Sequence, residues 1–546
     1  MKNKLNIKNL IYKSSLIILL IQFSLVGIYI FDHRARIRNK LLTFITYFEL
    51  SFDTLNPKDY FDYFQDMFRS FVAIKQLDRV DLSLSLNDNK KLECLRLRKK
   101  DCTKTGWVKA ELISKNEIFP IKVKAKGDRP IHRKNLSTMS FKIDIRGDKR
   151  FRGMEEFSLQ SPIIRNYTYE PMAARALEKE GIISPKHIYV RLYINGEYSG
   201  VKHIEESFSN ELIERSKKRF GPVFSLNEEE NTTYEDNSFD LHDNKYWMNS
   251  NSNLPNKALS VLRSSQKNPE VFNKYFDTEK WAKYFAMMDT LFMYHGMLPK
   301  SVKFYMNPVT GLIEPIFFDG HYLKGIWGGD FRFSDMLFAE NRLGNNCRAL
   351  CSNKYFYKML LGDEKNINEV FYNDYLKYME KYSSKEFYEL ILKKEWDNLW
   401  LERGTIYREF LKRDAFQYEG ILPHVGSLRN FKKRFHIIRK EIESAQKSLP
   451  VHSFSNLQNS IVIENKNSKF PQKYSLYCDD QKFLDKFILA KGKRIISKNL
   501  SFYNCKPESI LFSLDDGKKK IPLNNLLFDD YDFKKNIQKD MKKSSN

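Results

Sequence analysis

The sequence predicts an α+β fold in which a mixed β-sheet is followed by a helical part and then by a small β-rich module. Three observations lead to this fold class. Between residues 80 and 147 apolar and polar residues alternate with a period of two, which is typical of half-buried strands. Helical patterns prevail over residues 353–446, and short strand-like runs return after about residue 451. We therefore predict a main domain over residues 77–450 and a module with a basic tail over residues 451–546.

An uncharged run at residues 14–31, SSLIILLIQFSLVGIYIF, has about the length that spans a bilayer as a helix. The sequence YIFDHRAR at its end offers no small-residue cleavage site, which favours a single-span transmembrane anchor over a signal peptide. A basic segment, residues 1–13, precedes this run. Residues 32–76 follow it, and we expect them to form a membrane-proximal helical collar. Membrane contact is therefore predicted through residues 14–31.

The six cysteines fall into three local couples, Cys94/Cys102, Cys347/Cys351 and Cys478/Cys505. Paired cysteines suit disulfides in an oxidising compartment, whereas six unrelated buried thiols are the alternative. A metal site at Cys347 and Cys351 is disfavoured, because no second Cys/His couple lies nearby. We expect a single-pass protein of a bacterial inner membrane, with the bulk of the chain in the periplasm.

The formal net charge is +24, but the lysines are scattered along the whole chain. Clusters such as RLRKK (96–100) and GKKKI (517–521) fit a solvated basic surface better than a nucleic-acid groove. No nucleic-acid motif is present, so we predict no nucleic-acid partner. Anionic lipid head groups, phosphates and acidic polysaccharides remain candidate partners.

Within the main domain, each predicted element has a local signal. The predicted strands are residues 80–86, 107–113, 119–127 and 139–147, followed by a helix at 170–182 and hairpins at 187–206 and 301–319. The helix ends where Gly181 suits a left-handed C-cap, and the first hairpin turns at Asn195-Gly196. Residues 210–300 are predicted to be mainly helical, with a polar surface loop at 227–238.

From about residue 105 to residue 325 the chain carries an ordered series of motifs. They are WVKAEL, VKAKGDRPIH, SFKIDIRGDKRFRGMEEFSLQSPIIRNY, EGIISPKHIYVRLYINGEYSGVKHIEE, HGMLPKSVKFYMNPVTG and IEPIFFDG. In order and spacing the series resembles the CotH kinase family, the bacterial spore-coat type of atypical protein kinase, and most of all a divergent, membrane-anchored branch of it. The resemblance implies a two-lobed, kinase-like domain with a sheet lobe and a helical lobe, and ATP with Mg²⁺ or Mn²⁺ as cofactors.

Phosphoryl transfer needs cations on the phosphates. The resemblance makes Lys142, in the strand SFKID, the lysine that pairs with ATP phosphates and with a glutamate; a surface lysine on an edge strand is the alternative. Lys124 and Lys126 share one strand face and are rivals for the same role. The loop KGDRPIHRKN has glycine and basic groups suited to anions, which makes Arg129 and His132 candidate phosphate contacts.

Three further residues are candidates for the chemistry. The resemblance makes Glu205 the partner of the lysine or of the nucleotide, and we favour it for this role. A solvated strand-end acid is the alternative, which applies equally to the neighbouring Glu206. Many family members have Asp near the position of His295, so His295 either acts as the base or marks lost transfer activity; a histidine packed at a helix end is the alternative. It is a poor Mg²⁺ ligand, because hard cations prefer oxygen.

Asp319 ends the apolar run IEPIFFD. The resemblance makes it a ligand of the metal ion, whereas a turn-opening aspartate is the alternative reading. The residue two positions on, often a second Asp in the family, is His321 here.

Three functions follow from these observations. The first is a membrane-anchored kinase that transfers phosphate from ATP to a protein or surface-glycan hydroxyl. The second is a catalytically inactive pseudokinase scaffold in cell-envelope or exopolysaccharide assembly, which the scarcity of ATP outside the cytoplasm favours. The third, a carbohydrate-binding module without kinase ancestry, leaves the ordered motifs unexplained.

Overall fold

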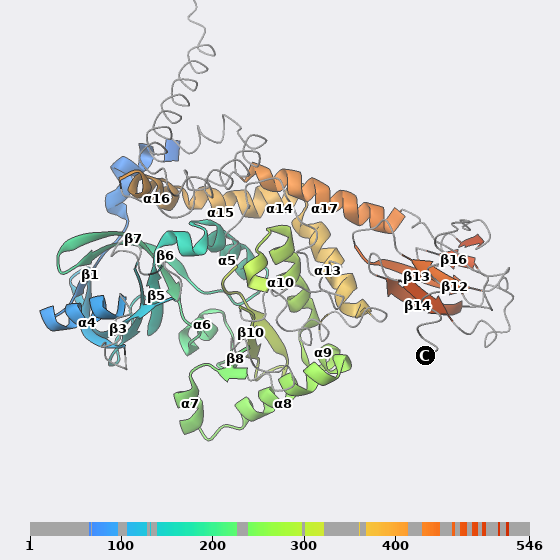
Figure 1. Cartoon of the computed structure of the whole chain (residues 1–546), viewed down its shortest axis with the longest axis horizontal. Coiled ribbons are helices and arrows are strands. Elements are labelled where there is room, and N and C mark those ends of the chain that lie inside the picture. Colours follow the sequence, from blue (N-terminus) through green and yellow to red (C-terminus); the bar gives the residue numbers. More distant parts are fainter. Residues whose placement is uncertain are drawn as a thin grey trace, which may run out of the picture.

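The computed structural model describes most of the middle of the chain. Described are residues 65–66, 68–96, 106–127, 132, 139–226, 239–297, 301–320, 360, 367–412 and 428–447, and the segments 461–464, 470–477, 483–489, 494–497, 511–513 and 520–522. The predicted α+β class is confirmed. A β-barrel lies at one end of the molecule, helices fill the middle, and the C-terminal strands lie at the other end (Figure 1).

The predicted mixed sheet closes into a barrel with the strand order β1-β2-β3-β4-β5-β7-β6. Its strands are β1 (Arg79–Ser83), β2 (Val108–Ser114), β3 (Glu117–Lys126), β4 (Ser140–Ile145), β5 (Glu156–Gln160), β6 (His187–Ile194) and β7 (Glu197–Glu206). All neighbouring strands are antiparallel except β1 and β6, whose parallel pairing closes the barrel. Helix α4 (Leu86–Arg96) follows β1, so the predicted strand 80–86 ends earlier than expected.

The alternating pattern of the strands separates an apolar barrel interior from a polar outer face. In β4, Phe141 and Ile143 are fully buried, whereas Lys142 between them is about one-third exposed. The strand register then aligns Lys142 with Ser158 on β5 and Ser158 with Glu205 on β7. This row lies on the outer face of the barrel.

The predicted turn signals are confirmed. Asn195 and Gly196 both have positive φ (49° and 86°) between β6 and β7, and Gly181 has φ 80° just after α5 (Tyr169–Lys179). Both places need the left-handed conformation that glycine adopts without steric cost.

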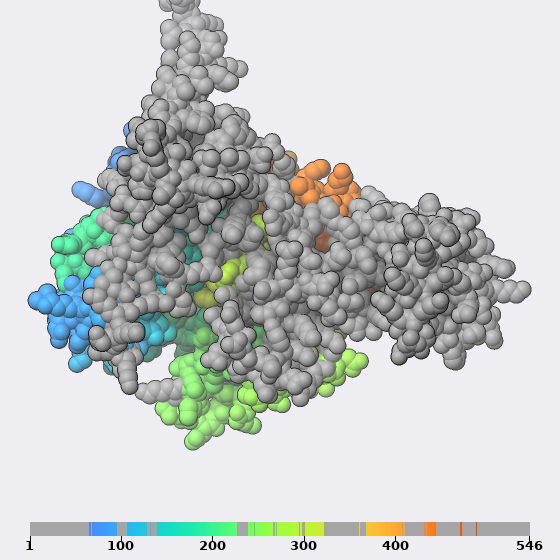
Figure 2. Space-filling view, viewed as in Figure 1, coloured from blue at the N-terminus to red at the C-terminus, as the bar shows by residue number. Residues whose placement is uncertain are grey.

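The middle of the molecule is helical around one aromatic-rich core. Its helices are α6 (Asn210–Arg215), α7 (Asn244–Asn249), α8 (Leu254–Lys267), α9 (Pro269–Tyr275), α10 (Thr278–Thr290), α13 (Glu369–Tyr382), α14 (Lys385–Phe387), α15 (Lys393–Asn398), α16 (Trp400–Lys412) and α17 (Arg429–Lys447). On the face shown in Figure 2, α4 and the barrel strands form the left edge of the described surface, and α7 and α8 form its lower edge.

A second sheet, in the order β11-β10-β8-β9, lies between the barrel and these helices. Its strands are β8 (Val223–Leu226), β9 (Phe239–Leu241), β10 (Lys303–Met306) and β11 (Ile313–Ile316). Ile316 bridges to Ile183, and the amide of Phe317 donates to the carbonyl of Ile183 over 2.9 Å. Because Ile183 lies between α5 and β6, this contact brings the end of β11 towards the barrel.

The described C-terminal segments are strands, as the sequence predicts. They are β12 (Ile461–Glu464), β13 (Gln472–Tyr477), β14 (Phe483–Leu489), β15 (Arg494–Ser497), β16 (Leu511–Ser513) and β17 (Lys520–Pro522). Phe470 and Ile488 join the helical core, and the Tyr372 hydroxyl of α13 donates to the carbonyl of Pro471 over 2.5 Å.

Some predictions for the N-terminal part of the chain concern residues outside those that the structure describes. Residues 1–64, with the predicted span at 14–31, lie outside the described residues, and so does the loop at 227–238. Of the helices that the structure describes, none combines the length and the apolar character that crossing a membrane requires. Cys94 in α4 is disulfide-bonded, and the other five cysteines lie outside the described residues.

Arg434 of α17 fixes the C-terminal end of α10. Its side chain is buried and donates to the backbone carbonyls of Thr290, at 3.0 Å, and of Asp289. The guanidinium also lies 4.7 Å from the ring centre of Phe292, which has a left-handed backbone (φ 57°). A cation at the last carbonyls of a helix is favourable because the helix dipole is negative there.

Arg434→Ala is expected to lower the free energy of unfolding by about 2–4 kcal/mol, because it removes a buried donor from the Thr290 and Asp289 carbonyls and leaves a cavity beside Phe292. The matched control is Lys432→Ala, which removes an exposed pair with Glu389 and should cost less than about 1 kcal/mol. Urea unfolding of both variants measures the difference. Equal costs would contradict the assigned role of Arg434.

Candidate active site around Arg165

A buried arginine, Arg165, lies at the centre of the predicted site. It ends the short 3-10 helix η4 (Pro162–Arg165), and its side chain is only 5% exposed. The next two residues, Asn166 and Tyr167, both have left-handed backbones (φ 47° and 59°). The Tyr189 hydroxyl of β6 donates to the carbonyl of Tyr167 over 2.5 Å and so ties this turn to the barrel.

Glu205 on β7 receives two hydrogen bonds from Arg165. Nε lies 2.7 Å from Oε1 and Nη2 lies 2.9 Å from Oε2, while the side-chain amide of Gln160 donates to Oε2 over 3.1 Å. Planar, two-bond pairing of this kind is the strong geometry of arginine with a carboxylate. Burial by itself would raise the pKa of Glu205, but the charges of Arg165 and Lys126 and the Arg165 hydrogen bond lower it to about 2.

Asp319 receives the third Arg165 contact, from Nη1 to Oδ1. Its other oxygen, Oδ2, lies 2.7 Å from Nδ1 of His295 and accepts from the Ser301 hydroxyl over 3.2 Å. The backbone of Asp319 is left-handed (φ 56°), a conformation in which Asp and Asn are enriched. Asp319 therefore has the backbone conformation of a turn residue, and its side chain also lies in the predicted active site.

A third carboxyl group, Glu170 in the first turn of α5, completes the cluster. It is fully buried, and its Oε1 lies 3.4 Å from Nε of Arg165. Burial raises the pKa of Glu170 well above its usual value, although Arg165 counteracts part of that rise. Burial alone would lower the pKa of Arg165, but the surrounding carboxylates hold it well above its ordinary value.

The structure places Lys126, and not Lys142, beside Glu205. The Lys126 amine donates to the Ser158 hydroxyl over 2.6 Å and lies 3.9 Å from Oε2 of Glu205. Lys142 instead pairs with Glu156 at 2.7 Å. Lys124 lies over the ring of Trp107, with the amine 4.7 Å from the ring centre.

The contacts of His132 and Glu206 are made with other residues than those of the cluster. Nδ1 of His132 is 2.9 Å from the Ser140 hydroxyl, and Arg129 lies outside the described residues. Glu206, the acid next to Glu205, accepts from Arg215 over 2.7 Å and from the backbone amide of Lys186 over 2.9 Å. Glu205, His295 and Asp319 are thus brought together, and the residue that joins them was not predicted.

The described side chains do not fit a bound divalent cation. Within the described ranges, no three His, Cys, Asp or Glu side chains are grouped so that they could hold a metal ion. One oxygen of Asp319 carries the Arg165 guanidinium, and the other contacts His295 and Ser301. Oxygen atoms committed to a cationic donor are poor ligands for a second cation, because the two positive charges repel.

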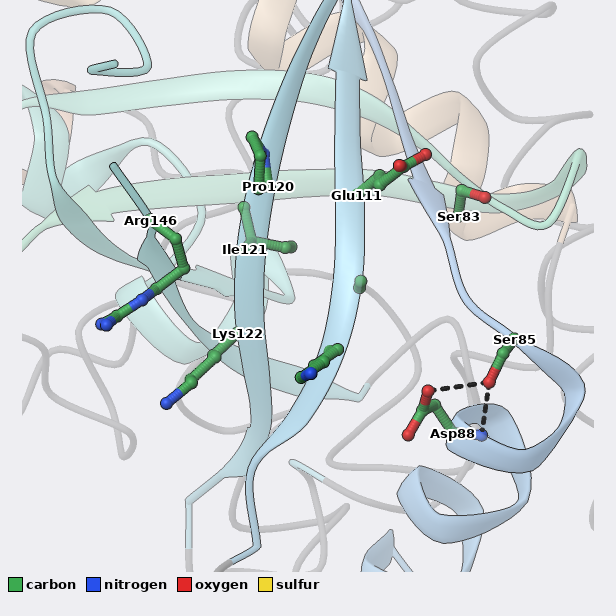
Figure 3. A pocket seen from close by; sticks show the side chains of 10 residues that line it. Ser83, Ser85, Asp88, Glu111, Pro120, Ile121, Lys122 and Arg146 are labelled. Carbon is green, nitrogen blue, oxygen red and sulfur yellow. Dashed lines mark hydrogen bonds between the residues drawn. The ribbon is translucent and has the colours of Figure 1, made fainter. Parts of the chain in front are cut away.

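A separate hollow of about 540 Å³ lies on the outer side of the barrel. Figure 3 shows Lys122 and Arg146 projecting on one side of it, and Asp88 hydrogen-bonded to Ser85 at the start of α4 on the other. None of the predicted site residues lines this hollow.

The class of protein follows from comparison with known families. A family model described as CotH kinase protein matches residues 121–449, well over half of the chain. The chain therefore belongs to the CotH kinase family, as its motifs predicted. No curated protein matches it. The matched range contains Arg165, Glu205, His295 and Asp319.

Glu170→Gln tests the electrostatics of the cluster through pH. The folded-state pKa of Glu170 is raised, so its contribution to stability is fully present below its unfolded pKa and is lost as pH rises through the folded pKa. Glutamine keeps the shape of the protonated group and removes this loss. We expect similar melting temperatures for variant and wild type near about pH 5, and a more stable variant near about pH 8.

Thermal unfolding over this pH range is the measurement, and Glu178→Gln, which alters an exposed partner of Arg215, is the control. A variant that becomes less stable than wild type at the higher pH would show instead that Glu170 is an ionised partner of Arg165.

Proposed function

We propose that this chain is a two-lobed kinase-like protein in which the barrel binds the phosphates of ATP and the helical part supplies the group that acts on an acceptor hydroxyl. One observation carries the proposal: Lys126 and Glu205 on the barrel meet His295 and Asp319 from the helical side, around Arg165. Phosphoryl transfer depends mainly on positioning and on positive charge at the phosphates, which this arrangement supplies.

Lys126 is the lysine that we assign to the phosphates. Its side chain is about one-third exposed, and Ser158 and Glu205 hold the amine on the barrel surface. Burial of the amine lowers the pKa of Lys126, and the Glu205 carboxylate opposes that effect. The Lys–Glu pair that the resemblance implied is thus assigned to Lys126 and Glu205 in place of Lys142 and Glu205.

His295 is the candidate general base. The Asp319 carboxylate, 2.7 Å from Nδ1, orients the imidazole, as a carboxylate does for a histidine base in other enzymes. The Ser301 hydroxyl, which lies just before β10, is 3.3 Å from the same nitrogen and helps to fix the orientation of the ring. The acceptor in this proposal is a hydroxyl group of a protein or of a surface glycan.

A pseudokinase scaffold in cell-envelope assembly is the second candidate function. The contact of Arg165 with Asp319 favours it, because the residue expected to hold Mg²⁺ in a kinase is already paired with a cation. For either function we propose anchoring through residues 14–31 and a periplasmic location. The disulfide at Cys94 supports an oxidising compartment.

The assignment of Lys126 predicts a difference between two matched variants. Lys126→Met should weaken ATP binding by about tenfold or more, because a charge-assisted contact to phosphate is lost. Lys142→Met, which removes a lysine paired with Glu156 on the same face, should change the affinity by less than about threefold. Calorimetric titration of ATP into the full-length chain, with and without Mg²⁺, measures both.

A larger loss in Lys142→Met would return the phosphate role to Lys142. Wild-type protein that shows no ATP binding under any of these conditions would contradict the proposed kinase function. The pseudokinase scaffold would then remain as the candidate function.

A further inference from the structure

The Arg165 guanidinium has the contacts that a bound cation would make. It bonds to both oxygens of Glu205, contacts one oxygen of Asp319, and lies 3.4 Å from Glu170. Three carboxyl groups from three separate elements, α5, β7 and the segment after β11, thus converge on one positive group. Glu205 and Asp319 thereby direct carboxylate oxygens, the ligands that hard divalent cations prefer, to a guanidinium group instead.

Arg165 is held rigidly in this position. Its side chain is 5% exposed, and the guanidinium lies 5.0 Å from the ring centre of Phe318. Two consecutive left-handed residues, Asn166 and Tyr167, set the direction of the chain just after it. An arginine on an exposed, unconstrained loop could leave the carboxylates to a metal ion, but this one is part of the packed interior.

We propose that Arg165 takes the place of a divalent metal ion in this site, so that the wild-type site neither needs nor binds Mg²⁺ or Mn²⁺. The positive charge that balances Glu205 and Asp319 is then covalently part of the chain. A divalent ion entering the cluster would have to displace a guanidinium that makes hydrogen bonds to both carboxylates, or be repelled by it. Removal of the Arg165 charge exposes the oxygens of Glu205 and Asp319 to a divalent ion that enters the vacated position.

The test is a titration of Mn²⁺ alone into the full-length chain, followed by the electron paramagnetic resonance signal of free Mn²⁺ and by thermal unfolding. Wild type should show no stoichiometric Mn²⁺ binding and no metal-dependent rise in melting temperature. Arg165→Gln should melt at a lower temperature without metal. It should bind Mn²⁺ and recover by more than about 2 °C at saturating metal, because a ligand that binds only the folded state stabilises it.

Arg215→Gln is the matched control. Arg215 also holds buried and exposed acids, Glu206 at 2.7 Å and Glu178 at 2.8 Å, but outside the cluster. This variant should lose stability without gaining Mn²⁺ binding. Recovery of both variants by Mn²⁺ would indicate a general salt effect and overturn the inference.

Two further outcomes would overturn it: Arg165→Gln that folds but binds no Mn²⁺, or wild type that binds one Mn²⁺ and loses it on Asp319→Asn. If Arg165→Gln does not fold, the Mn²⁺ titration of wild type alone is the test. Wild type that neither binds Mn²⁺ nor melts at a higher temperature in its presence would then support the inference. No nucleotide is used, so failure of ATP binding would refute the proposed kinase function and leave this inference standing.

Discussion

The contact of Arg165 with Glu205 and Asp319 is the interaction on which the rest of the site depends. Glu205 belongs to the barrel, whereas Asp319 follows β11 and contacts His295 and Ser301. One buried guanidinium therefore sets the position of the barrel residues relative to the helical residues. Removing one partner of such a buried pair costs about 3–5 kcal/mol, because it leaves an uncompensated charge in the interior.

Local signals in the sequence were sufficient for most of the elements. Asn195-Gly196 and Gly181 require left-handed backbones whatever the fold, and the period-two alternation marked the strands of the sheet. Closure of the barrel was not predictable in the same way. It depends on the parallel pairing of β1 with β6, which lie more than a hundred residues apart and have no turn between them to set their register.

The site was predictable in part for a similar reason. Glu205, His295 and Asp319 stand at the ends of elements in motifs that resemble the CotH kinase family, so their positions could be inferred. The choice between Lys126 and Lys142 could not, because both point to the same face and only the barrel shows which amine reaches Glu205. Arg165 carries no signal of its own: a lone arginine after the apolar run PII is indistinguishable from a surface residue until the turn at Asn166 is seen.

A site whose cation is a side chain differs in function from one that recruits a metal, because its charge balance is fixed by folding. The central claim is that Arg165 couples the barrel to the helical part through Glu205 and Asp319. A double-mutant cycle with Glu205→Gln and Asp319→Asn, measured by urea unfolding of the full-length chain, tests it most directly. The structure predicts a coupling energy of at least about 1 kcal/mol between the two substitutions, and additivity within about 0.3 kcal/mol would contradict it.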